Sequence, residues 1–571
     1  MKLVLKVYKP HLFGVITVIA LVLARAMSEL ALPRFLGLIV DQGIARSDTA
    51  FILKTGFFML LVNLLGMVAS FGSAYLSSKI STEVGSSLRC RLFERISEYT
   101  PSDINTFGTA SLITRVTNDV NQVQNLSMMS LRLMIMAPLM MTGGIIMALS
   151  QDIKLSAVLL VALPVIAVMV TVFGRISLPM FTSMQTKTDG LARVVRENLS
   201  GLRVIRAFNK RAREEERFAK ANRELTDLSL RTVRLMGLLM PLMSLLLNTA
   251  VISVLWLGAK RINMGTLQIG SLLAFIQYIS QILFSLLMVS MLFISIPQAM
   301  VSVRRIGEVI ETEPGIKNRK ELASMPSVSD LEFSEVSMRY KGAESPAICD
   351  ISFNCKKGEF LAIIGSTGSG KTTILSLIQR FFDAEKGSIK ISGTDIKDIS
   401  QEELRSLMAY VPQKTFLFSG TVNSNVAYGG KSELVTEAIE TAQAADFVYK
   451  MEDGLGASVA RGGTNLSGGQ KQRLAIARAL ARNAPILLLD DSFSALDAAT
   501  ESRLRNALKE KTADKIVIMA TQRIRSAMNA DKIIVLDEGR IVGVGRHEEL
   551  AAGNAVYREL AGTQLEEAIH E

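Results

Sequence analysis

Long uncharged runs constrain the fold of this chain more than any other feature of its sequence. An α-helix needs about 20 mostly apolar residues to cross the hydrocarbon core of a bilayer. Six segments approach or exceed this length: Leu12–Leu36, Thr55–Ser78, Leu133–Gln151, Leu155–Gly174, Leu235–Ala259 and Ile262–Val303. The first of them is interrupted by two charged residues, Arg25 and Glu29. The last is about twice as long as one span requires. It has no turn signal in its middle, so we expect one helix that continues past the membrane surface, and six spans in total.

The segments between the spans predict which side of the membrane they occupy. Two of them are long and polar, Lys79–Arg132 and Arg175–Arg234, and the second carries 14 Lys and Arg. Basic loops are typical of the cytoplasmic side. Because both contain few Gly or Pro residues, they predict helices that extend into the cytoplasm. The basic group Ala259–Arg261 lies on the opposite side and conflicts with this rule.

The composition changes after residue 303. A charged linker is expected over residues 304–325, and beyond it strand-like runs alternate with helical patterns to residue 571. This alternation is typical of an α/β domain with a central sheet. The sequence thus predicts a membrane domain over 1–303 and a water-soluble α/β domain over 326–571. The net charge of +11 is attributed to the cytoplasmic excess of Lys and Arg, not to nucleic-acid binding.

A glycine-rich loop follows the apolar run Phe360–Ile364 and precedes a helical pattern. It fits G-x-x-x-x-G-K-[ST] between a strand and a helix, which predicts a P-loop whose amides surround phosphates. Lys371 is expected to reach the β- and γ-phosphates of ATP, and the Thr372 hydroxyl to bind Mg²⁺. The candidate ATP-binding residues of the loop are Gly365, Ser366, Thr367, Gly368, Ser369, Gly370, Lys371, Thr372 and Thr373.

Two further motifs lie close together later in the chain. The apolar run Ile486–Leu489 delivers Asp490 and Asp491 to its end, an arrangement that holds a metal ion and orients a water. Shortly before it, "LSGGQKQRLAIARAL" (Leu466–Leu480) places a serine and two glycines at a predicted helix start. Together with the P-loop, this segment resembles the signature sequence of ATP-binding-cassette (ABC) proteins. Six spans followed by one such domain resemble an exporter-type half-transporter, with a membrane α-helical part and an α/β P-loop nucleotide-binding domain.

The resemblance assigns roles to further positions. Tyr340 matches the aromatic residue that stacks on adenine. Gln413 and Asp490 match residues that contact Mg²⁺, beside Thr372. In the family two nucleotide-binding domains pair head to tail, so the signature loop and the loop after Asp491 act on the ATP of the partner. The residues placed in trans are Ser467, Gly468, Gly469, Gln470 and Asp497. The segments Pro101–Val120 and Ser200–Arg211 resemble the coupling segments that dock on these domains.

Two positions depart from the pattern of members that hydrolyse ATP rapidly. Asp491 stands where Glu is expected as catalytic base, and Gln522 where a His is expected. A shorter carboxylate and a side chain that never becomes cationic predict a degenerate, slow ATP site. Because the signature loop is complete, it can serve an active site on a different chain. We therefore expect a heterodimer with a homologous half-transporter that supplies Glu and His; a slow homodimer is the alternative.

The membrane part offers candidate substrate contacts. Arg25 and Glu29 lie four residues apart on one helix face, where they either fix helix packing or face a cavity. Gln277, Gln281 and a dense set of methionines that includes Met288 are the other candidates. The methionines either pack against lipid and core or form an adaptable apolar pocket. The predicted activity is ATP-driven export of hydrophobic or amphipathic compounds across a bacterial inner membrane. A lipid flippase and an ATP-gated channel or regulatory subunit are the alternatives.

Overall fold

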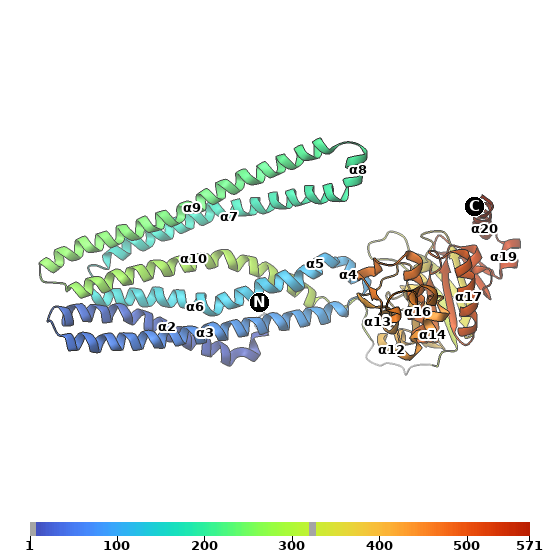
Figure 1. The fold of residues 1–571 in the computed structure, drawn as a ribbon, viewed down its shortest axis with the longest axis horizontal. Coiled ribbons are helices and arrows are strands. Elements are labelled where there is room, and N and C mark those ends of the chain that lie inside the picture. Colours follow the sequence, from blue (N-terminus) through green and yellow to red (C-terminus); the bar gives the residue numbers. More distant parts are fainter. Residues whose placement is uncertain (1–6, 319–326, 571) are drawn as a thin grey trace. The chain divides into compact units, whose positions relative to one another are not determined.

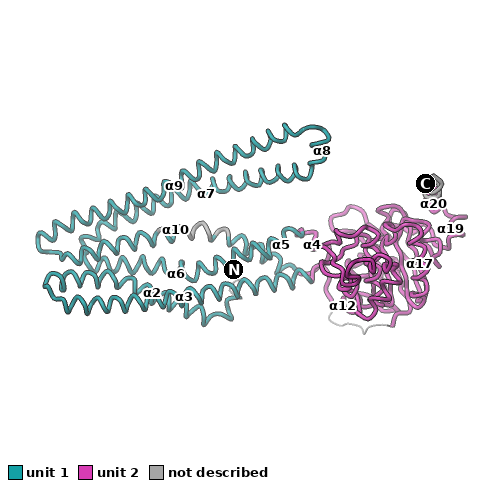
Figure 2. Tube along the Cα trace, viewed as in Figure 1, with its two compact units in different colours: residues 1–97, 109–312 teal, residues 98–108, 313–571 magenta. Residues whose placement is uncertain are grey.

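The computed structural model describes residues 7–318 and 327–570, and its chain forms two compact units (Figure 2). The first unit comprises Met1–Ser97 and Thr109–Thr312, and the second comprises Glu98–Gly108 and Glu313–Glu571. The helix that ends the first unit continues to Glu311, into the linker expected over 304–325. Residues 319–325 of that linker lie outside the described residues. The domain boundaries at 303 and 325 therefore stay predictions.

The first unit is helical throughout. Its elements are η1 (Lys9–His11), α2 (Leu12–Leu38), η2 (Ile39–Ile44), α3 (Thr49–Ser97), α5 (Thr109–Thr114), η3 (Arg115–Asp119), α6 (Val120–Gln151), α7 (Ala157–Ser200), α8 (Leu202–Ala207), α9 (Arg211–Asn263) and α10 (Ile269–Glu311). Six helices in the described residues are long and apolar enough to cross a membrane, which confirms the expected number of spans. The last apolar run starts later than expected. Its residues 262 and 263 still belong to α9, and α10 begins after a turn at Gly265, whose φ is 65°.

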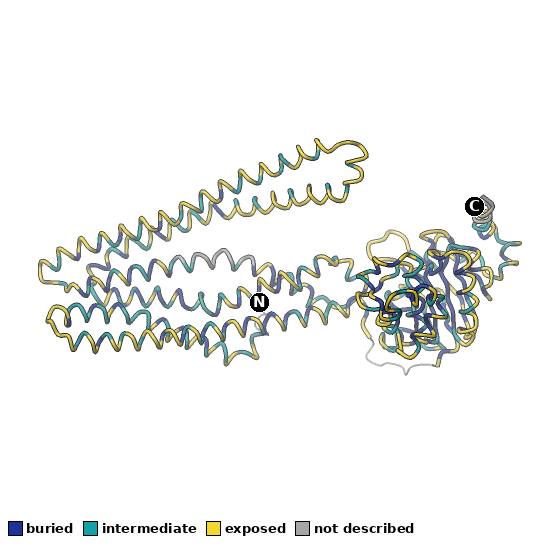
Figure 3. The backbone as a smooth tube through the Cα atoms, in the orientation of Figure 1, coloured by how far each residue is buried: buried dark blue, intermediate teal, exposed yellow. Residues whose placement is uncertain are grey.

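Within this unit α2, α3, α6 and α10 pack side by side, while α7 and α9 form a hairpin with α8 at its tip (Figure 1). The hairpin packs against the rest of the unit mainly where α9 meets α10. Most of its length beyond that contact is exposed (Figure 3). At one end of the hairpin Arg261 forms an ion pair with Asp152, which is 10% exposed. This pairing gives a physical reason for the basic group that conflicted with the loop-charge rule.

The second unit contains a six-stranded sheet in the order β12-β11-β3-β10-β9-β6. Its strands are β3 (Phe360–Gly365), β6 (Met408–Val411), β9 (Ile486–Asp490), β10 (Ile516–Thr521), β11 (Lys532–Asp537) and β12 (Arg540–Gly545). All pair in parallel except β12, which lies antiparallel to β11. A second sheet, in the order β2-β1-β4-β5, comprises β1 (Asp330–Met338), β2 (Ile348–Lys356), β4 (Lys386–Ile391) and β5 (Thr394–Asp395). The short strands β7 (Gly420–Thr421) and β8 (Ser458–Val459) pair separately.

The second unit also contains helices (Figure 1). They are α4 (Pro101–Phe107), α11 (Lys371–Ile378), α12 (Gln401–Ser406), α13 (Val422–Ala427), α14 (Val435–Thr441), α15 (Ala445–Val448), α16 (Gly468–Arg482), α17 (Ala498–Lys511), α18 (Ile524–Ala527), α19 (His547–Gly553) and α20 (Ala555–His570). The core strand β9 is buried along its whole length, as is β10. This burial on both faces explains why their sequences are continuous apolar runs and not alternating ones.

The register of the parallel strands determines where the site forms. Ile364 pairs with Thr521, Ala520 with Asp490, and Leu489 with Val411. The carboxyl ends of four neighbouring strands therefore lie at one edge of the sheet. Ligands of open α/β sheets bind at this edge.

Candidate ATP site

The phosphate loop connects β3 to α11. The Lys371 ammonium donates hydrogen bonds to the carbonyl oxygens of Gly365 (2.8 Å) and Ser366 (2.7 Å), so its side chain curls over the loop. Gly370 has a φ of 102°, and a Cβ there would lie 2.6 Å from a side-chain carbon of Ile348. Glycine is required at this position on both counts. Lys371 is only 8% exposed, and this burial lowers the pKa of its ammonium group. The negative charges of Asp491 and Asp490 raise the pKa, but by less than burial lowers it.

Asp490 lies at the end of β9 beside the first turn of α11. The Thr372 hydroxyl donates to one carboxylate oxygen at 3.0 Å, and the Tyr410 hydroxyl donates to the other at 3.2 Å. The carboxylate is buried, which raises its pKa despite these two bonds. A hydroxyl next to a carboxylate supplies the oxygen ligands that Mg²⁺ prefers in phosphate sites. Thr372 and Asp490 are thus placed to hold the ion between protein and phosphates.

Tyr410 was not among the residues expected from the sequence. It lies on β6, and only the pairing of β6 with β9 brings its hydroxyl to Asp490. No local motif signals this contact, because the two residues are 80 positions apart.

Tyr340 follows β1 of the four-stranded sheet and contacts α11, the helix after the phosphate loop. Its hydroxyl lies 2.9 Å from that of Thr373, and its ring packs edge-on against Phe382 with centroids 5.2 Å apart. The side chain is 37% exposed, so one ring surface is accessible for stacking. This placement beside the phosphate loop fits the adenine contact expected for Tyr340.

Asp491 has a left-handed backbone conformation, with a φ of 45°. Its amide donates to the Ala520 carbonyl at 2.8 Å, and its carbonyl accepts from the Ser494 hydroxyl at 2.9 Å. Within the described ranges, no group donates a hydrogen bond to its carboxylate. The main chain at this residue is therefore fixed on both sides, while the carboxylate remains available to a ligand.

Gln522 and Gln413 follow the neighbouring strands. The Gln522 side chain accepts a hydrogen bond from the Thr367 hydroxyl of the phosphate loop at 3.4 Å. Gln413 comes two residues after β6 and is exposed. The structure thus brings the loop, Asp490, Asp491 and Gln522 to one edge of the sheet.

The signature segment forms a separate structure at the start of α16. The Ser467 hydroxyl accepts from the Gln470 amide at 3.3 Å, and the Gln470 side chain accepts from the Ser467 amide at 2.9 Å. These reciprocal bonds form a capping box. A Cβ on Gly469 would lie 3.0 Å from the Ala495 carbonyl, in the loop that leads to Asp497. In the described part of the chain, no hydrogen bond joins Ser467–Gln470 to the phosphate loop.

Asp497 caps a second helix next to this segment. Its carboxylate accepts from the Thr500 amide at 2.9 Å at the start of α17, and such backbone bonds lower its pKa. Asp497 and the signature segment thus lie together, with their polar groups ordered by contacts inside this chain.

The first unit contains a cavity of about 480 Å³. Four predicted substrate contacts line it, namely Arg25, Glu29, Gln281 and Met288, whereas Gln277 is exposed and lies outside it. The Arg25 guanidinium donates to Glu29 at 2.9 Å, and the Gln281 amide donates to the Glu29 carbonyl at 3.2 Å. The lining residues that the sequence did not single out are Ile166, Ser244, Leu247, Ser280, Leu283, Phe284 and Ser285.

A phosphate loop, a buried carboxylate for Mg²⁺ and six spanning helices on one chain define a membrane-embedded P-loop ATPase. Family models match in the same two parts: "ABC transporter transmembrane region" over residues 15–286 and "ABC transporter" over residues 348–494. An uncharacterised ABC transporter ATP-binding protein of Mycobacterium bovis is 39% identical over 564 residues, with 97% of each chain covered. An uncharacterised ABC transporter ATP-binding protein of Bacillus subtilis, YfiB, is 35% identical, with 99% of each covered.

Two further comparisons concern function and fold. An ATP-dependent lipid A-core flippase of Syntrophus aciditrophicus is 31% identical, covering 99% of this chain and 94% of that one. The structure of a bacterial Atm1-family ABC exporter with ATP bound superposes with a TM-score of 0.81 at 24% identity, covering 96% and 98% of the two chains.

The chain therefore belongs to the ABC transporter family and is an exporter-type half-transporter. It is an ATPase that uses ATP with Mg²⁺ and couples hydrolysis to transport. It spans the bacterial inner membrane several times, with its nucleotide-binding domain in the cytoplasm.

Proposed function

We propose that this chain is one half of a heterodimeric exporter of hydrophobic and amphipathic compounds. Its phosphate loop holds ATP at a slowly hydrolysing composite site, and its signature loop completes a faster site on the partner chain. The observation that carries this proposal is the short carboxylate of Asp491 on a main chain that is fixed on both sides.

The carboxylate of Asp491 does not extend as far from the main chain as the carboxylate of a Glu would at the same position. Asp is one methylene shorter, which retracts the carboxylate by about 1.5 Å. The backbone bonds to Ala520 and Ser494 oppose a main-chain shift that would compensate. A misplacement of about 1 Å can reduce a rate by about 10²-fold.

Gln522 weakens the site in a second way. It bonds Thr367 of the phosphate loop, so it lies where a side chain can touch the γ-phosphate. A neutral amide offers no charge-assisted hydrogen bond, which is roughly twice as strong as a neutral one. Both departures act on hydrolysis and leave the groups that bind ATP in place.

The signature loop supports a non-identical partner. Ser467 and Gln470 order each other, and neither depends on Asp491 or Gln522. A homodimer of this chain contains two sites with Asp491, both slow. A partner with Glu and His contains one fast site, completed by this chain's intact signature.

The cavity supports an amphipathic cargo. Its volume lies within the range of about 300–1,000 Å³ that is typical of small-molecule sites. Methionine side chains such as Met136, Met140 and Met243 form an adaptable apolar wall. The paired charges of Arg25 and Glu29 and the Gln281 amide supply a polar part. Such a lining suits compounds with an apolar body and a polar group.

ATPase rates of this chain alone, and of the chain combined with a homologous half-transporter that carries Glu and His at the two positions, test the proposal. The double variant Asp491→Glu, Gln522→His should raise hydrolysis by this chain alone by up to about 10²-fold. Asp514→Glu, at an exposed carboxylate away from the site, is the matched control and should leave the rate unchanged. An equally slow double variant that still binds ATP would show that these two side chains do not limit the rate.

A lipid flippase is the second candidate, and it rests on the relatives that carry this name. It keeps the fold and the ATP site and changes the cargo. Stimulation of ATPase activity by lipids, with no response to hydrophobic dyes in the same vesicles, would favour the flippase. Stimulation by dyes would favour the exporter of amphipathic compounds.

A further inference from the structure

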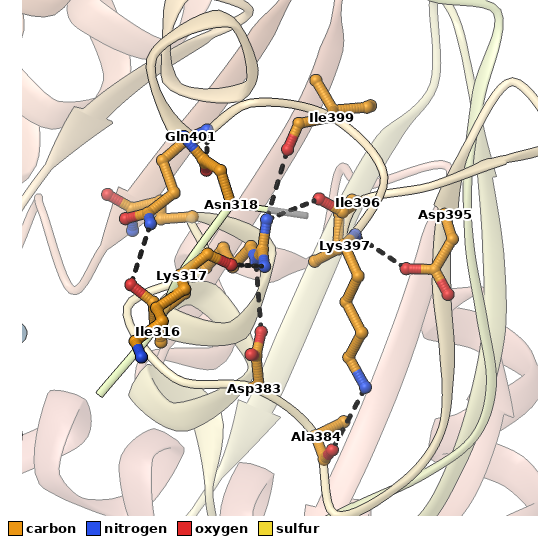
Figure 4. A network of polar contacts seen from close by, with 12 residues as sticks. Ile316, Lys317, Asn318, Asp383, Ala384, Asp395, Ile396, Lys397, Ile399 and Gln401 are labelled. Carbon is orange, nitrogen blue, oxygen red and sulfur yellow. Dashed lines mark hydrogen bonds and ion pairs between the residues drawn. The ribbon is translucent and has the colours of Figure 1, made fainter. Parts of the chain in front are cut away.

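A buried arginine lies just beyond the helix that follows the phosphate loop. Arg380 is 2% exposed, and its φ is 51°. Its guanidinium donates to the carbonyls of Lys317 (3.1 Å), Ile396 (3.3 Å) and Ile399 (3.2 Å), and to the Asp383 carboxylate (3.1 Å) (Figure 4). A buried charge persists only when its donors are satisfied in this way. Neither ATP binding nor hydrolysis, as described above, uses this residue.

One of those carbonyls belongs to the segment that follows the last membrane helix. We call residues Glu313–Asn318 the strap. Besides the Lys317 contact, the Gln401 side chain donates to the Ile316 carbonyl at 3.3 Å, and the Gln401 amide donates to the Asn318 side chain at 3.1 Å (Figure 4). Three consecutive strap residues are thus fixed to the α/β fold of the second unit.

The other part of the strap contacts α4, which belongs to the segment Pro101–Val120 that resembles a coupling segment. The Gly315 amide donates to the Asp103 carboxylate at 3.0 Å. The same oxygen accepts from the Thr100 amide (3.0 Å) and the Thr100 hydroxyl (2.8 Å), in the capping box that starts α4. Burial alone raises the pKa of Asp103, but the N–H groups of Gly315 and Thr100 outweigh it and leave the pKa below its usual value. Asp103 is therefore ionised and binds the strap and α4 together.

We propose that the strap is a mechanical link between α11 and α4, with Arg380 and Asp103 as its positioning residues. α11 begins at Lys371, which is expected to contact phosphate, and ends at Ile378, two residues before Arg380. Gly315 and Lys317 are two residues apart, so an extended chain spans at most about 7 Å between them. This length leaves little slack. A shift of α11 on phosphate binding is carried through Arg380 and Lys317 to Gly315 and Asp103.

This link differs from a static attachment in what ATP does to it. If the strap only held α4 in place, variants that break the strap would change the exchange of α4 amides with solvent equally with and without ATP. A link transmits the nucleotide state, so the change on adding ATP depends on an unbroken path. The proposal needs ATP binding by this chain and neither a partner nor hydrolysis. Its failure would therefore leave the heterodimer proposal unaffected.

Hydrogen–deuterium exchange of the purified full chain in lipid nanodiscs, with and without Mg²⁺–ATP, tests the link. ATP should slow exchange in the phosphate loop, in the strap and in residues 98–108. Arg380→Lys keeps the charge but loses the planar donor fork. It should abolish the response of the strap and of α4 while that of the phosphate loop remains. Asp103→Ala should abolish the α4 response alone.

Two matched controls lie in the same region. Lys397→Met removes a lysine that also donates to a backbone carbonyl, that of Ala384, and Asp395→Ala removes a carboxylate that also accepts from a backbone amide. No hydrogen bond or ion pair joins either side chain to the strap in the described part of the chain, so both variants should respond to ATP as the wild type does.

Lengthening the strap covers the case in which Arg380→Lys fails to fold. Two glycines inserted after Gly315 leave both ends of the strap with their contacts but add slack. The insertion should abolish the α4 response with ATP affinity unchanged. An α4 response that persists in Arg380→Lys or in the insertion variant would overturn the proposal, as would a wild-type chain whose α4 ignores bound ATP.

Discussion

The phosphate-loop side and the signature side of the nucleotide-binding domain differ in how closely they match the family pattern. On the first side, Asp491 and Gln522 replace the expected Glu and His. On the second, Ser467 to Gln470 match the signature and are ordered by their own capping box. The groups expected to bind ATP, such as Lys371 and Thr372, are in place on the first side as well. The contrast supports the proposal that ATP binding and ATP hydrolysis are separated within this domain.

The largest expected effect comes from the signature side. In the complex with the partner, Ser467→Arg should reduce the ATPase rate by about 10²–10³-fold, the scale seen when one donor to transition-state charge is removed. In the proposed heterodimer, the change acts on the fast site of the partner. Ser467→Thr is the matched control, because Thr also caps helices. A complex that keeps its rate with Ser467→Arg would show that the signature side is not where fast hydrolysis occurs.

A smaller effect is expected from the adenine contact on the phosphate-loop side. Tyr340→Leu removes the aromatic surface, and stacking on a base is worth about 1–3 kcal/mol. ATP affinity of the chain alone should fall by about tenfold in a binding titration. Tyr340→Phe keeps the ring and loses only the bond to Thr373, so it should bind nearly as the wild type does. Equal losses in both variants would contradict the stacking role.

The smallest effect concerns stability. Burial raises the pKa of Asp490 in the folded state, so the folded chain holds that proton more tightly than the unfolded chain. The contribution of Asp490 to stability therefore increases as pH falls through the folded pKa toward the unfolded value. Asp490→Asn should remove this slope and slightly raise the nucleotide-free melting temperature at pH 7. It should also abolish the added stability from Mg²⁺ with ATP. Thermal unfolding over a series of pH values from 4 to 7 measures both, and an unchanged slope across that range would contradict the assignment.

Much of the ATP site is predictable because its parts are local. The phosphate loop needs only a strand, a glycine-rich turn and a helix, all within residues 360–378. The meeting of Asp490 with Thr372 follows once β3, β10 and β9 are recognised as parallel neighbours. Six spans follow from length and hydropathy alone.

Other features depend on contacts that sequence patterns do not encode. Arg380 meets Lys317 across 63 residues, and Tyr410 meets Asp490 across 80. Gln277 and Gln281 look equivalent in the sequence, yet only Gln281 lines the cavity. Helix periodicity places both on one face and leaves open how far along the helix the cavity extends. The fixed backbone of Asp491 likewise comes from Ala520 on a neighbouring strand.

Phosphate release by the purified chain alone, with ATP occupancy measured in the same sample, tests the central claim most directly. The account predicts a chain that holds ATP and releases phosphate slowly, with little further loss in Asp491→Asn. Rapid release that Asp491→Asn abolishes would contradict it, because the short carboxylate would then be a working base and no second kind of chain would be needed.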